Sequence, residues 1–274
     1  MLGIFRTEAL RPLAISTLLL LGLTACTAPA PAPEPEIDAV TSPTWVTGDP
    51  AGDWGEVVPT LSYLAGFSIE GREIPCERLG TGPTAVFYLA AIHGNEPAGR
   101  PLLVTLRQHL LTNPQLLEGV SVVILPIANP DGLAARRRHN LNDVDLNRNF
   151  PTENWRANST GGAAPLSQPE SRAVYDLIER HRPRVIVSLH QPLNCIDYDG
   201  PAAELAAAMA EKCALPVRKL GARPGSLGSY AGETLGIPTI TVEMPRSDDG
   251  RTAEQLWQTY GEMLLVPLTW PAAR

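Results

Sequence analysis

The feature that most constrains this chain is an alternation, from about residue 48 onward, of short apolar runs with longer helix-like stretches. Residues 85–92 (AVFYLAAI) read as a buried strand, and residues 97–110, which begin with a proline, read as the helix that follows it. Such alternation is typical of a mostly parallel sheet with helices on both faces. The sequence therefore predicts one α/β domain around a mixed, mostly parallel central sheet.

The same pattern predicts the remaining elements. Further strands are expected at residues 120–128, 184–189 and 239–242, and further helices at residues 169–181, 202–213 and 253–265. The turn-forming residues 129–132 (NPDG) close the second strand. The sequence contains no internal repeat, so we expect these elements to belong to a single architecture.

Four polar residues stand at the ends of the predicted strands: His93, Asn129, His190 and Glu243. Ligands of open α/β sheets bind outside the carboxyl ends of the strands. If these strands are parallel neighbours, the four positions converge on one crevice. The sequence predicts the functional site there.

The pair His93 and Glu96 has a spacing that suits metal ligands. The two residues are three apart across a strand-to-helix turn, where Gly94 relieves backbone crowding. Catalytic zinc takes three nitrogen or oxygen ligands and keeps one position open, so His190 would complete a His₂Glu set. Each residue also has a simpler interpretation, because Glu96 suits the positive end of a helix and His190 suits a hydrogen-bonded core position.

Glu243 would lie at the buried carboxyl end of a strand, where a carboxylate is costly unless something uses it. Activation of a water molecule at the metal is one such use, and a salt bridge to Arg246 is the alternative. In the phrase DLNRNF, Arg148 beside Asn147 suits two-point recognition of a carboxylate. The alternative for Arg148, and for Arg138 before it, is a solvated loop charge.

Taken together, these residues resemble the zinc metallocarboxypeptidases. The matching phrases occur in the order of that family: HGNE at 93–96, NPDG at 129–132, DLNRNF at 145–150, SLH at 188–190 and TVE at 241–243. Within the family the chain is most similar to bacterial murein-peptide amidases, through ANPDG, VDLNRNFP, H-x-P-L-x-C-I at 190–196 and PGSLGS at 224–229. The resemblance implies a zinc-carboxypeptidase-like fold and cleavage between γ-D-glutamate and meso-diaminopimelate in cell-wall peptides.

The resemblance also implies roles at the metal. One Zn²⁺ would be held by His93, Glu96 and His190. Glu243 would act as general base and proton shuttle, and Arg138 would polarise the scissile carbonyl and stabilise its oxygen. A zinc-dependent hydrolase of the metallocarboxypeptidase type is the activity that follows.

The same resemblance implies how a substrate would be held. Asn147 and Arg148 would bind its terminal carboxylate, and Ser226 and Leu227 in the PGSLGS phrase would form part of the wall of the leaving-residue pocket. The chain departs from the digestive carboxypeptidases in two respects. The segment between Glu96 and His190 is shorter than theirs, and no tyrosine lies at the distance upstream of the base where they carry a mobile phenol. Tyr230 is too close to the base to inherit that role, so its function stays open.

The first 26 residues look like a targeting segment. Arg6 and Arg11 precede an apolar stretch that is too short for a comfortable membrane span, and Leu23 to Cys26 resembles the lipobox of bacterial lipoproteins. We expect a signal peptide at 1–25, a lipidated Cys26 with a Pro/Ala-rich tether at 26–50, and the peptidase domain at 51–274. The protein would then be a membrane-anchored lipoprotein of the bacterial cell envelope that faces the periplasm. An ordinary signal peptide is the alternative.

The amino-acid composition narrows the classes of binding partner that we expect. Asp and Glu outnumber Lys and Arg by 29 to 22, a net charge of −7, which argues against nucleic acid. The expected partners are a cell-wall peptide and, through the lipid anchor, the membrane. Beyond Cys26 the chain has Cys76, Cys195 and Cys213, which permit at most one internal disulfide, and its pairing stays open.

Two other functions stay open. Aspartoacylase and succinylglutamate desuccinylase enzymes also carry HGNE and DLNR phrases but act on small N-acyl amino acids, whereas NPDG and PGSLGS favour the peptidase. A non-catalytic cell-wall-binding lipoprotein on a degenerate enzyme fold would be expected to lack a ligand or the base. All four positions are present in this chain.

Overall fold

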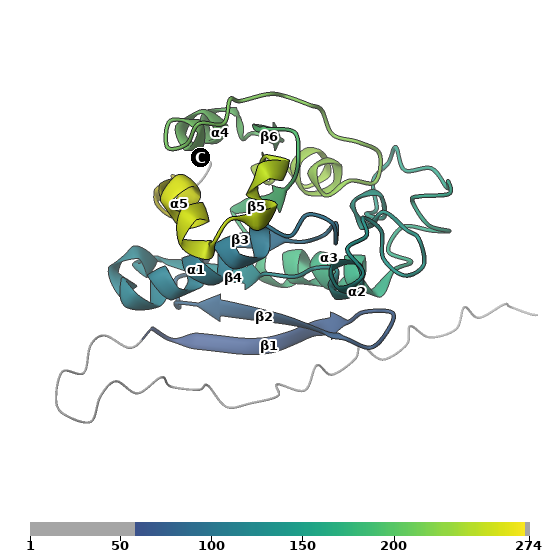
Figure 1. The fold of residues 1–274 in the computed structure, drawn as a ribbon, viewed down its shortest axis with the longest axis horizontal. Coiled ribbons are helices and arrows are strands. Elements are labelled where there is room, and N and C mark those ends of the chain that lie inside the picture. The colour runs from purple at the N-terminus through teal and green to yellow at the C-terminus, as the bar shows by residue number, and fades with distance from the viewer. Residues whose placement is uncertain (1–57, 272–274) are drawn as a thin grey trace, which may run out of the picture. The chain divides into compact units, whose positions relative to one another are not determined.

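The computed structural model describes residues 58–271, which build a seven-stranded sheet and the helices that cover it (Figure 1). The strands are β1 (Thr60–Phe67), β2 (Glu73–Leu79), β3 (Thr84–Ala90), β4 (Val120–Leu125), β5 (Val185–His190), β6 (Cys195–Asp199) and β7 (Thr239–Glu243). The α-helices are α1 (Gly99–Thr112), α2 (Pro130–Ala134), α3 (Pro169–His181), α4 (Ala203–Ala210) and α5 (Ala253–Thr269). Shorter helical segments are η1 (Pro114–Leu117), η2 (Leu146–Arg148), η3 (Gly228–Thr234) and η4 (Arg246–Gly250).

The strand order is β1-β2-β4-β3-β5-β7-β6. The four inner strands β4, β3, β5 and β7 are parallel neighbours, whereas β1, β2 and β6 join the sheet antiparallel. The predicted α/β class with a mixed sheet is therefore confirmed. Because the inner strands run in one direction, their carboxyl ends meet at one edge of the sheet, and His190 of β5 stands opposite Glu243 of β7 in the register.

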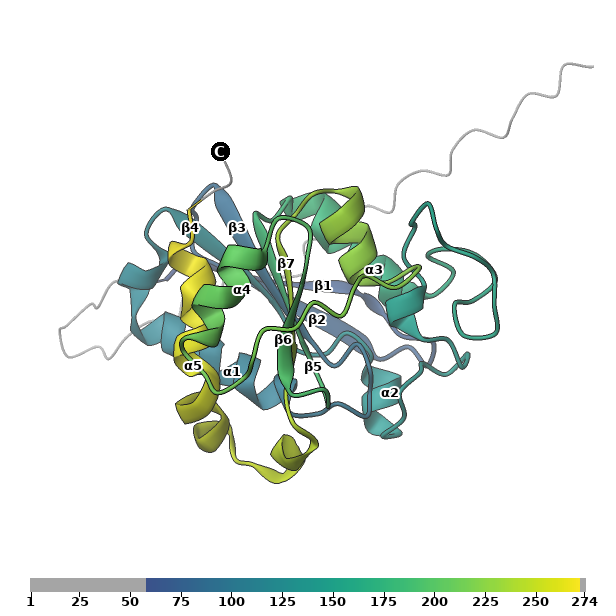
Figure 2. The same ribbon diagram turned by 90° about the horizontal axis from the view of Figure 1, so that it is seen from above.

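The inner strands are buried on both faces, which explains why they read as continuous apolar runs. In β3, Val86 and Tyr88 belong to the core beneath α1, α4 and α5, while Phe87 and Leu89 belong to a second core beneath α3 and η3. Figure 2 shows α1, α4 and α5 on one side of the sheet and α3 on the other. The expectation of helices on both faces is confirmed.

The structure differs from the predicted elements at the sheet edges. Strands β1, β2 and β6 were not predicted. The residues of β1 are mostly half-buried, and β6 (CIDYD) carries two aspartates, so neither shows the apolar signal of an inner strand. Strand β3 also ends at Ala90 rather than at residue 92, because Ala91 adopts a left-handed φ of 51° and turns the chain toward His93.

Within the described residues, Cys76, Cys195 and Cys213 are free thiols, so no disulfide forms among them. None of the helices that the structure describes combines the length and apolar character that a membrane span requires. The predicted signal peptide at 1–25, the lipidation site Cys26 and the tether at 26–50 lie outside the described residues.

His181, the last residue of α3, connects this helix to the edge strand β1. Its Nε2 atom lies 2.5 Å from the hydroxyl of Tyr63, which is half-buried in β1. Burial lowers the pKa of His181 to about 4, and the positive charges of Arg78 and Arg180 act in the same direction. The folded protein therefore holds a neutral imidazole that the unfolded chain protonates at a pH of about 6.5.

This difference predicts a pH dependence of stability. A group whose folded pKa is depressed stabilises the fold above its unfolded pKa, and this contribution is lost as the pH falls from about 6.5 toward about 4. As the pH falls through this range, we expect the Tm of the wild type to decrease relative to that of His181→Gln, because the glutamine takes up no proton. Thermal unfolding followed by circular dichroism at several pH values measures the difference. His109→Gln on α1 controls for the loss of a histidine elsewhere, and a constant gap between wild type and His181→Gln would contradict the assignment.

Candidate active site

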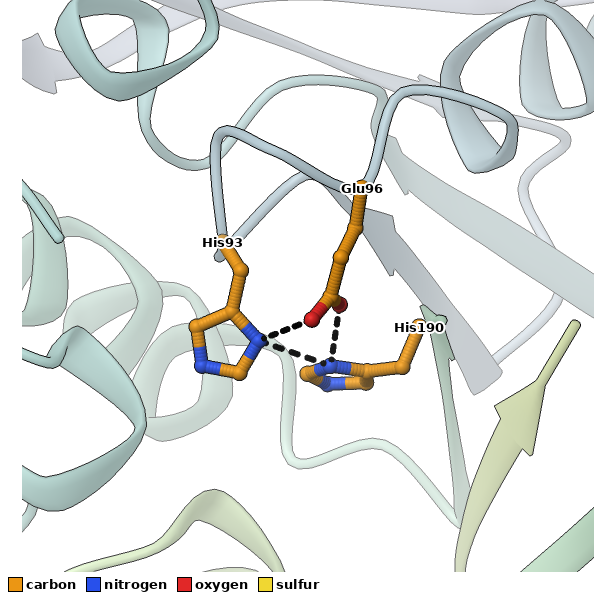
Figure 3. A group of neighbouring side chains, drawn as sticks. All are labelled: His93, Glu96 and His190. Atoms are coloured by element: carbon orange, nitrogen blue, oxygen red, sulfur yellow. Dashed lines mark hydrogen bonds and ion pairs between the residues drawn. The ribbon is translucent and has the colours of Figure 1, made fainter. Parts of the chain in front are cut away.

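Three side chains from two strand ends meet in a buried cluster. The Nδ1 atom of His93 lies 2.9 Å from Oε1 of Glu96, and Nδ1 of His190 lies 2.9 Å from Oε2 of the same carboxylate. The two imidazole Nδ1 atoms are 3.2 Å apart. Figure 3 shows these atoms pointing toward one another, with all three side chains nearly withdrawn from solvent.

The cluster fits a zinc ion by its donor set and by its spacing. One ligand atom from each of His93, Glu96 and His190 can be chosen so that all lie within 4.8 Å of one another. Two ligands bound about 2.0–2.1 Å from a tetrahedral centre are about 3.3 Å apart, which is close to the separations found here. Two imidazoles and a carboxylate form one of the standard ligand sets of catalytic zinc. The three predicted ligands are therefore brought together, and their predicted role is compatible with the geometry.

A close backbone contact fixes the loop that carries His93 and Glu96. A Cβ atom on Gly94 would stand 1.9 Å from the backbone carbon of Gly132, so only glycine fits at this point. The amide of Gly94 also donates to the carbonyl oxygen of Arg138 at 3.3 Å. The loop that carries the HGNE motif is thus in direct contact with the start of helix α2, which the NPDG motif forms.

Asn129 supports this contact and does not face the pocket. Its Oδ1 accepts a hydrogen bond from Gly132 N at 2.8 Å, and its Nδ2 donates to Ile92 O at 3.3 Å. The expectation that Asn129 converges on the crevice with the other strand-end residues is therefore corrected. Its side chain is buried as the N-terminal cap of α2.

Asp145 orients His93 from the side away from Glu96. Its Oδ1 lies 3.0 Å from Nε2 of His93, and its Oδ2 accepts from Nε of Arg138 at 3.1 Å. A carboxylate on the second ring nitrogen is the usual support of a metal-binding histidine. Asp145 opens the DLNRNF motif, but no separate role was predicted for it.

The electrostatics keep both carboxylates of this group ionised. Burial opposes the charge of Glu96, but hydrogen bonds from His190 and His93 hold the pKa of Glu96 well below its usual range. Burial also opposes the charge of Asp145, and His93 together with Arg138 holds the pKa of Asp145 below its usual range. Burial tends to lower the pKa of His93, but Asp145 and Glu96 raise it above its ordinary value.

The cluster opens into a pocket of about 240 Å³. The predicted site residues that line it are His93, Glu96, Arg138, Asn147, Arg148, His190, Ser226 and Glu243. Further lining residues that the sequence did not single out include Gln191, Asp197, Asp199, Thr241 and Arg223. Asp197 and Asp199 are at alternate positions of β6, so recognition of that strand would have been the signal that places them on one face.

Glu243 is the last residue of β7 and lines the same pocket as His93, Glu96 and His190. It is 9% exposed, and its Oε2 accepts from the backbone N–H of Leu193 at 3.3 Å. Arg246, the alternative partner, donates instead to Asn95 O at 2.9 Å and lies 3.7 Å from Asp249. In the part of the chain that the structure describes, Glu243 forms no ion pair, so its carboxylate is available to a ligand or a water molecule.

Two arginines supply positive charge to the pocket. Arg138 donates to Asp145 and, from Nη1 at 3.3 Å, to Oε1 of Glu96, which turns its guanidinium toward the cluster. Arg148 is half-buried, and burial together with Arg138 and Arg223 lowers its pKa, against the opposite effect of Asp145. Among the described residues no carboxylate lies within ion-pair distance of the Arg148 side chain. An anionic ligand would complement it.

The loop 224–229 contributes differently from the prediction. Ser226 lines the pocket, as expected of a wall residue. Leu227 does not: its side chain is 2% exposed and packs in the core with Phe150 and Tyr230. Its backbone N–H donates to Oδ1 of Asn147 at 2.8 Å, so Leu227 contributes by orienting that amide. The apolar side chain packs in the core because burial removes it from water, and Leu227 does not belong to the lining of the pocket.

Tyr230 also packs in the interior of the protein and does not line the pocket. Its hydroxyl donates to Oε1 of Glu179 on α3 at 2.7 Å, and its ring stacks on Phe150 with centroids 6.0 Å apart. It is 4% exposed and lies outside the lining of the pocket. The expectation that Tyr230 does not serve as the mobile phenol agrees with this placement.

Comparison with protein families identifies a match over residues 58–200 to the model described as zinc carboxypeptidase. Murein peptide amidase A of Escherichia coli K12 is 36% identical over 185 residues, which cover 61% of this chain and 74% of that protein. Murein peptide amidase A of Vibrio campbellii is 32% identical over 185 residues, which cover 61% of this chain and 72% of that protein.

Solved structures show the same likeness. The murein-tripeptide amidase of Escherichia coli O157 superposes with a TM-score of 0.60 at 29% identity, covering 78% of this chain and 93% of that one. Carboxypeptidase A of Helicoverpa armigera superposes with a TM-score of 0.64 at 22% identity, covering 76% of this chain and 66% of that one, a likeness of fold alone.

The geometry separates the predicted metal ligands from the predicted base. We expect Glu243→Gln to retain bound zinc, because it changes none of the three clustered ligands, and to lose about 100- to 10,000-fold in peptide hydrolysis, because an amide cannot accept the proton. His190→Ala should lose the metal. Zinc content by inductively coupled plasma mass spectrometry and hydrolysis rates measure both effects.

The matched control is Glu211→Gln, an exposed residue at the end of α4, which should change neither quantity. If Glu243→Gln lost its zinc but kept its rate per bound metal, the assignment of base and ligand would be reversed.

Proposed function

The chain belongs to the zinc carboxypeptidase family, and from this we infer that it is a zinc-dependent hydrolase acting on murein peptides. We propose more specifically that it cleaves the amide bond between γ-D-glutamate and a C-terminal meso-diaminopimelate. The observation that carries the proposal is the convergence in one pocket of the His93, Glu96 and His190 cluster with Glu243 and two arginines. That set combines three candidate zinc ligands, a candidate general base and two cationic groups that could bind substrate oxygens.

The cluster of His93, Glu96 and His190 would hold the zinc. A bound zinc ion would supply a Lewis acid and lower the pKa of water enough for deprotonation near neutral pH. The remaining contributions come from the side chains of the protein.

Glu243 is placed to move the proton. It stands opposite His190 in the register of β5 and β7, so its carboxylate projects into the same pocket as the cluster. As general base it takes a proton from the attacking water, and it can then deliver that proton to the leaving amine. Its lack of an ion pair within the described residues leaves it free for both steps.

Arg138 and Arg148 are proposed to bind different oxygens of the substrate. Arg138 lies against Glu96 and Asp145, so its guanidinium is near the cluster and can donate to the carbonyl oxygen as charge develops. Arg148 and Asn147 lie farther along the same loop and would bind the terminal carboxylate. The two arginines therefore separate stabilisation of the reaction from recognition of the chain end.

The other two functions are not favoured. The family match and the murein amidase relatives weigh against a deacylase of the aspartoacylase type. A non-catalytic binding protein is disfavoured because the ligand cluster and Glu243 are intact in one pocket.

The test compares three substrates: L-Ala-γ-D-Glu-meso-Dap, the same tripeptide with its terminal α-carboxylate amidated, and N-acetylaspartate. We expect release of free diaminopimelate from the first, detected by mass spectrometry. Loss of the carboxylate at Arg148 should lower kcat/KM by at least about tenfold, since each charge-assisted hydrogen bond contributes about 1.5–3 kcal/mol. Rapid hydrolysis of N-acetylaspartate, or equal rates on the free and amidated peptides, would overturn the proposal.

We also propose that the protein is a lipoprotein of the bacterial cell envelope, anchored through Cys26 and facing the periplasm. The support is the sequence of residues 1–26 together with a cell-wall peptide as the proposed substrate. A lipid anchor would hold the enzyme near the wall from which its peptides come.

Cys26→Ser tests the anchor. The full-length wild type should partition with membranes, and the variant should be released or remain unprocessed, because the thiol that carries the lipid is absent. Membrane fractionation and mass spectrometry of the mature N-terminus measure this. A mature wild-type protein that begins at another residue, or carries no lipid, would remove the proposal of an anchor.

A further inference from the structure

The pocket extends from the cluster of His93, Glu96 and His190 to polar residues of β6 and β7. Asp197 of β6 pairs in register with Thr241 of β7, and both residues line the pocket together with Asp199. Since side chains alternate along a strand, Asp197 and Asp199 lie on the same face of β6. Strand β6 is the edge strand of the sheet and pairs with β7.

Asp197 is a buried carboxylate with little compensation. It is 7% exposed, and its Oδ1 accepts one hydrogen bond, from the backbone N–H of Leu220 at 2.8 Å. Across the described residues, no lysine, arginine or histidine lies within ion-pair distance of Asp197. A buried carboxylate that lacks a cationic partner is costly, so this arrangement favours a positive charge supplied by a ligand.

Asp199 differs because its charge is already paired. Nζ of Lys219 lies 3.1 Å from its Oδ1. Two glycines of η3 pack against the other side of this aspartate, and a Cβ on Gly228 would come 1.9 Å from its Oδ2. Asp199 is therefore held in place by its neighbours, and Asp197 is the acidic group of β6 that is left for a ligand.

The pocket also holds positive charge that no carboxylate of the described residues pairs with. Arg148 and Arg223 both line it, and within residues 58–271 neither forms an ion pair with a carboxylate. A pocket with unpaired guanidinium groups and an unpaired buried carboxylate complements a ligand with both charges. A C-terminal amino acid whose side chain ends in an ammonium group has this pattern, since its α-carboxylate and its ammonium stand apart.

We propose that Asp197 is a specificity-determining residue that binds the side-chain ammonium group of the leaving amino acid. The inference rests on the proposed function, because that function places the leaving residue in this pocket. meso-Diaminopimelate carries such an ammonium group on its side chain. A leaving residue of equal length without the amine leaves Asp197 buried and unpaired, and is cleaved more slowly.

The experiment uses matched pairs of substrates. The first pair is L-Ala-γ-D-Glu-meso-Dap and the same peptide ending in L-2-aminopimelate, which keeps the carbon chain and the distal carboxylate but lacks the distal amine. The second pair is a blocked dipeptide ending in lysine or in norleucine. For each pair the ratio of kcat/KM values is measured for the full-length wild type and for Asp197→Asn, whose amide oxygen can still accept from Leu220 N.

The wild type should prefer the amine-bearing substrate by at least about tenfold, the value of one charge-assisted contact. Asp197→Asn should reduce that ratio to near one. The matched control Asp176→Asn, an exposed aspartate on α3, should keep the wild-type ratio. A structural role of Asp197 would lower both rates and leave the ratio unchanged.

The outcomes separate this inference from the proposed function. Equal wild-type rates within the γ-linked pair would overturn the role of Asp197 and leave the proposed function intact. Hydrolysis of the dipeptides without hydrolysis of the γ-linked peptides would overturn the proposed function, and the lysine-to-norleucine ratio would then decide on Asp197. If the ratio is kept in Asp197→Asn but lost in Asp199→Asn, Asp199 binds the ammonium group and the proposal for Asp197 is overturned. Failure to cleave any of the four peptides would overturn both.

Discussion

The active site depends on the hydrogen bonds that the buried carboxylate of Glu96 accepts. Its two oxygens each contact a different imidazole, and its Oε2 also accepts from the backbone N–H of Gln191 at 3.2 Å. A carboxylate that is 2% exposed is tolerated only with such partners. These partners come from the loop after β3 and from the end of β5, so the charge is compensated only when the parallel strands have taken their native register.

The same requirement connects loops that are distant in sequence. Arg138 reaches Glu96, and Asp145 reaches His93, from the segment between α2 and η2, so each ionised group is held by residues of another segment. The contact between Gly94 and Gly132 leaves no space for a side chain between the loop after β3 and helix α2. The site is therefore preorganised by backbone contacts as well as by charge, which is the condition for electrostatic stabilisation of a reacting group.

The inner part of the fold could be predicted because burial on both faces leaves a continuous apolar run, as in β3, β4 and β5. The edge strands were not predicted because they lack a continuous apolar run. The residues of β1 are mostly half-buried, and β6 has aspartates where an inner strand has aliphatic side chains. Three of the four strand-end residues that were predicted to converge, His93, His190 and Glu243, line one pocket, because their strands are parallel neighbours. The inward turn of Leu227, the capping position of Asn129 and the support by Asp145 depend on packing between segments, which spacing along the chain does not reveal.

The position of β6 at the rim of the sheet has an evolutionary consequence. His93, Glu96, His190 and Glu243 belong to inner strands or to the loops that follow them, where a change of side chain disturbs two packed layers. Asp197 belongs to a strand that is bonded to a neighbour on one side only. Substitutions on this strand can thus accumulate with little disturbance of the hydrolytic centre, and descendants of one ancestral hydrolase could acquire different leaving-residue preferences while inheriting the same chemistry.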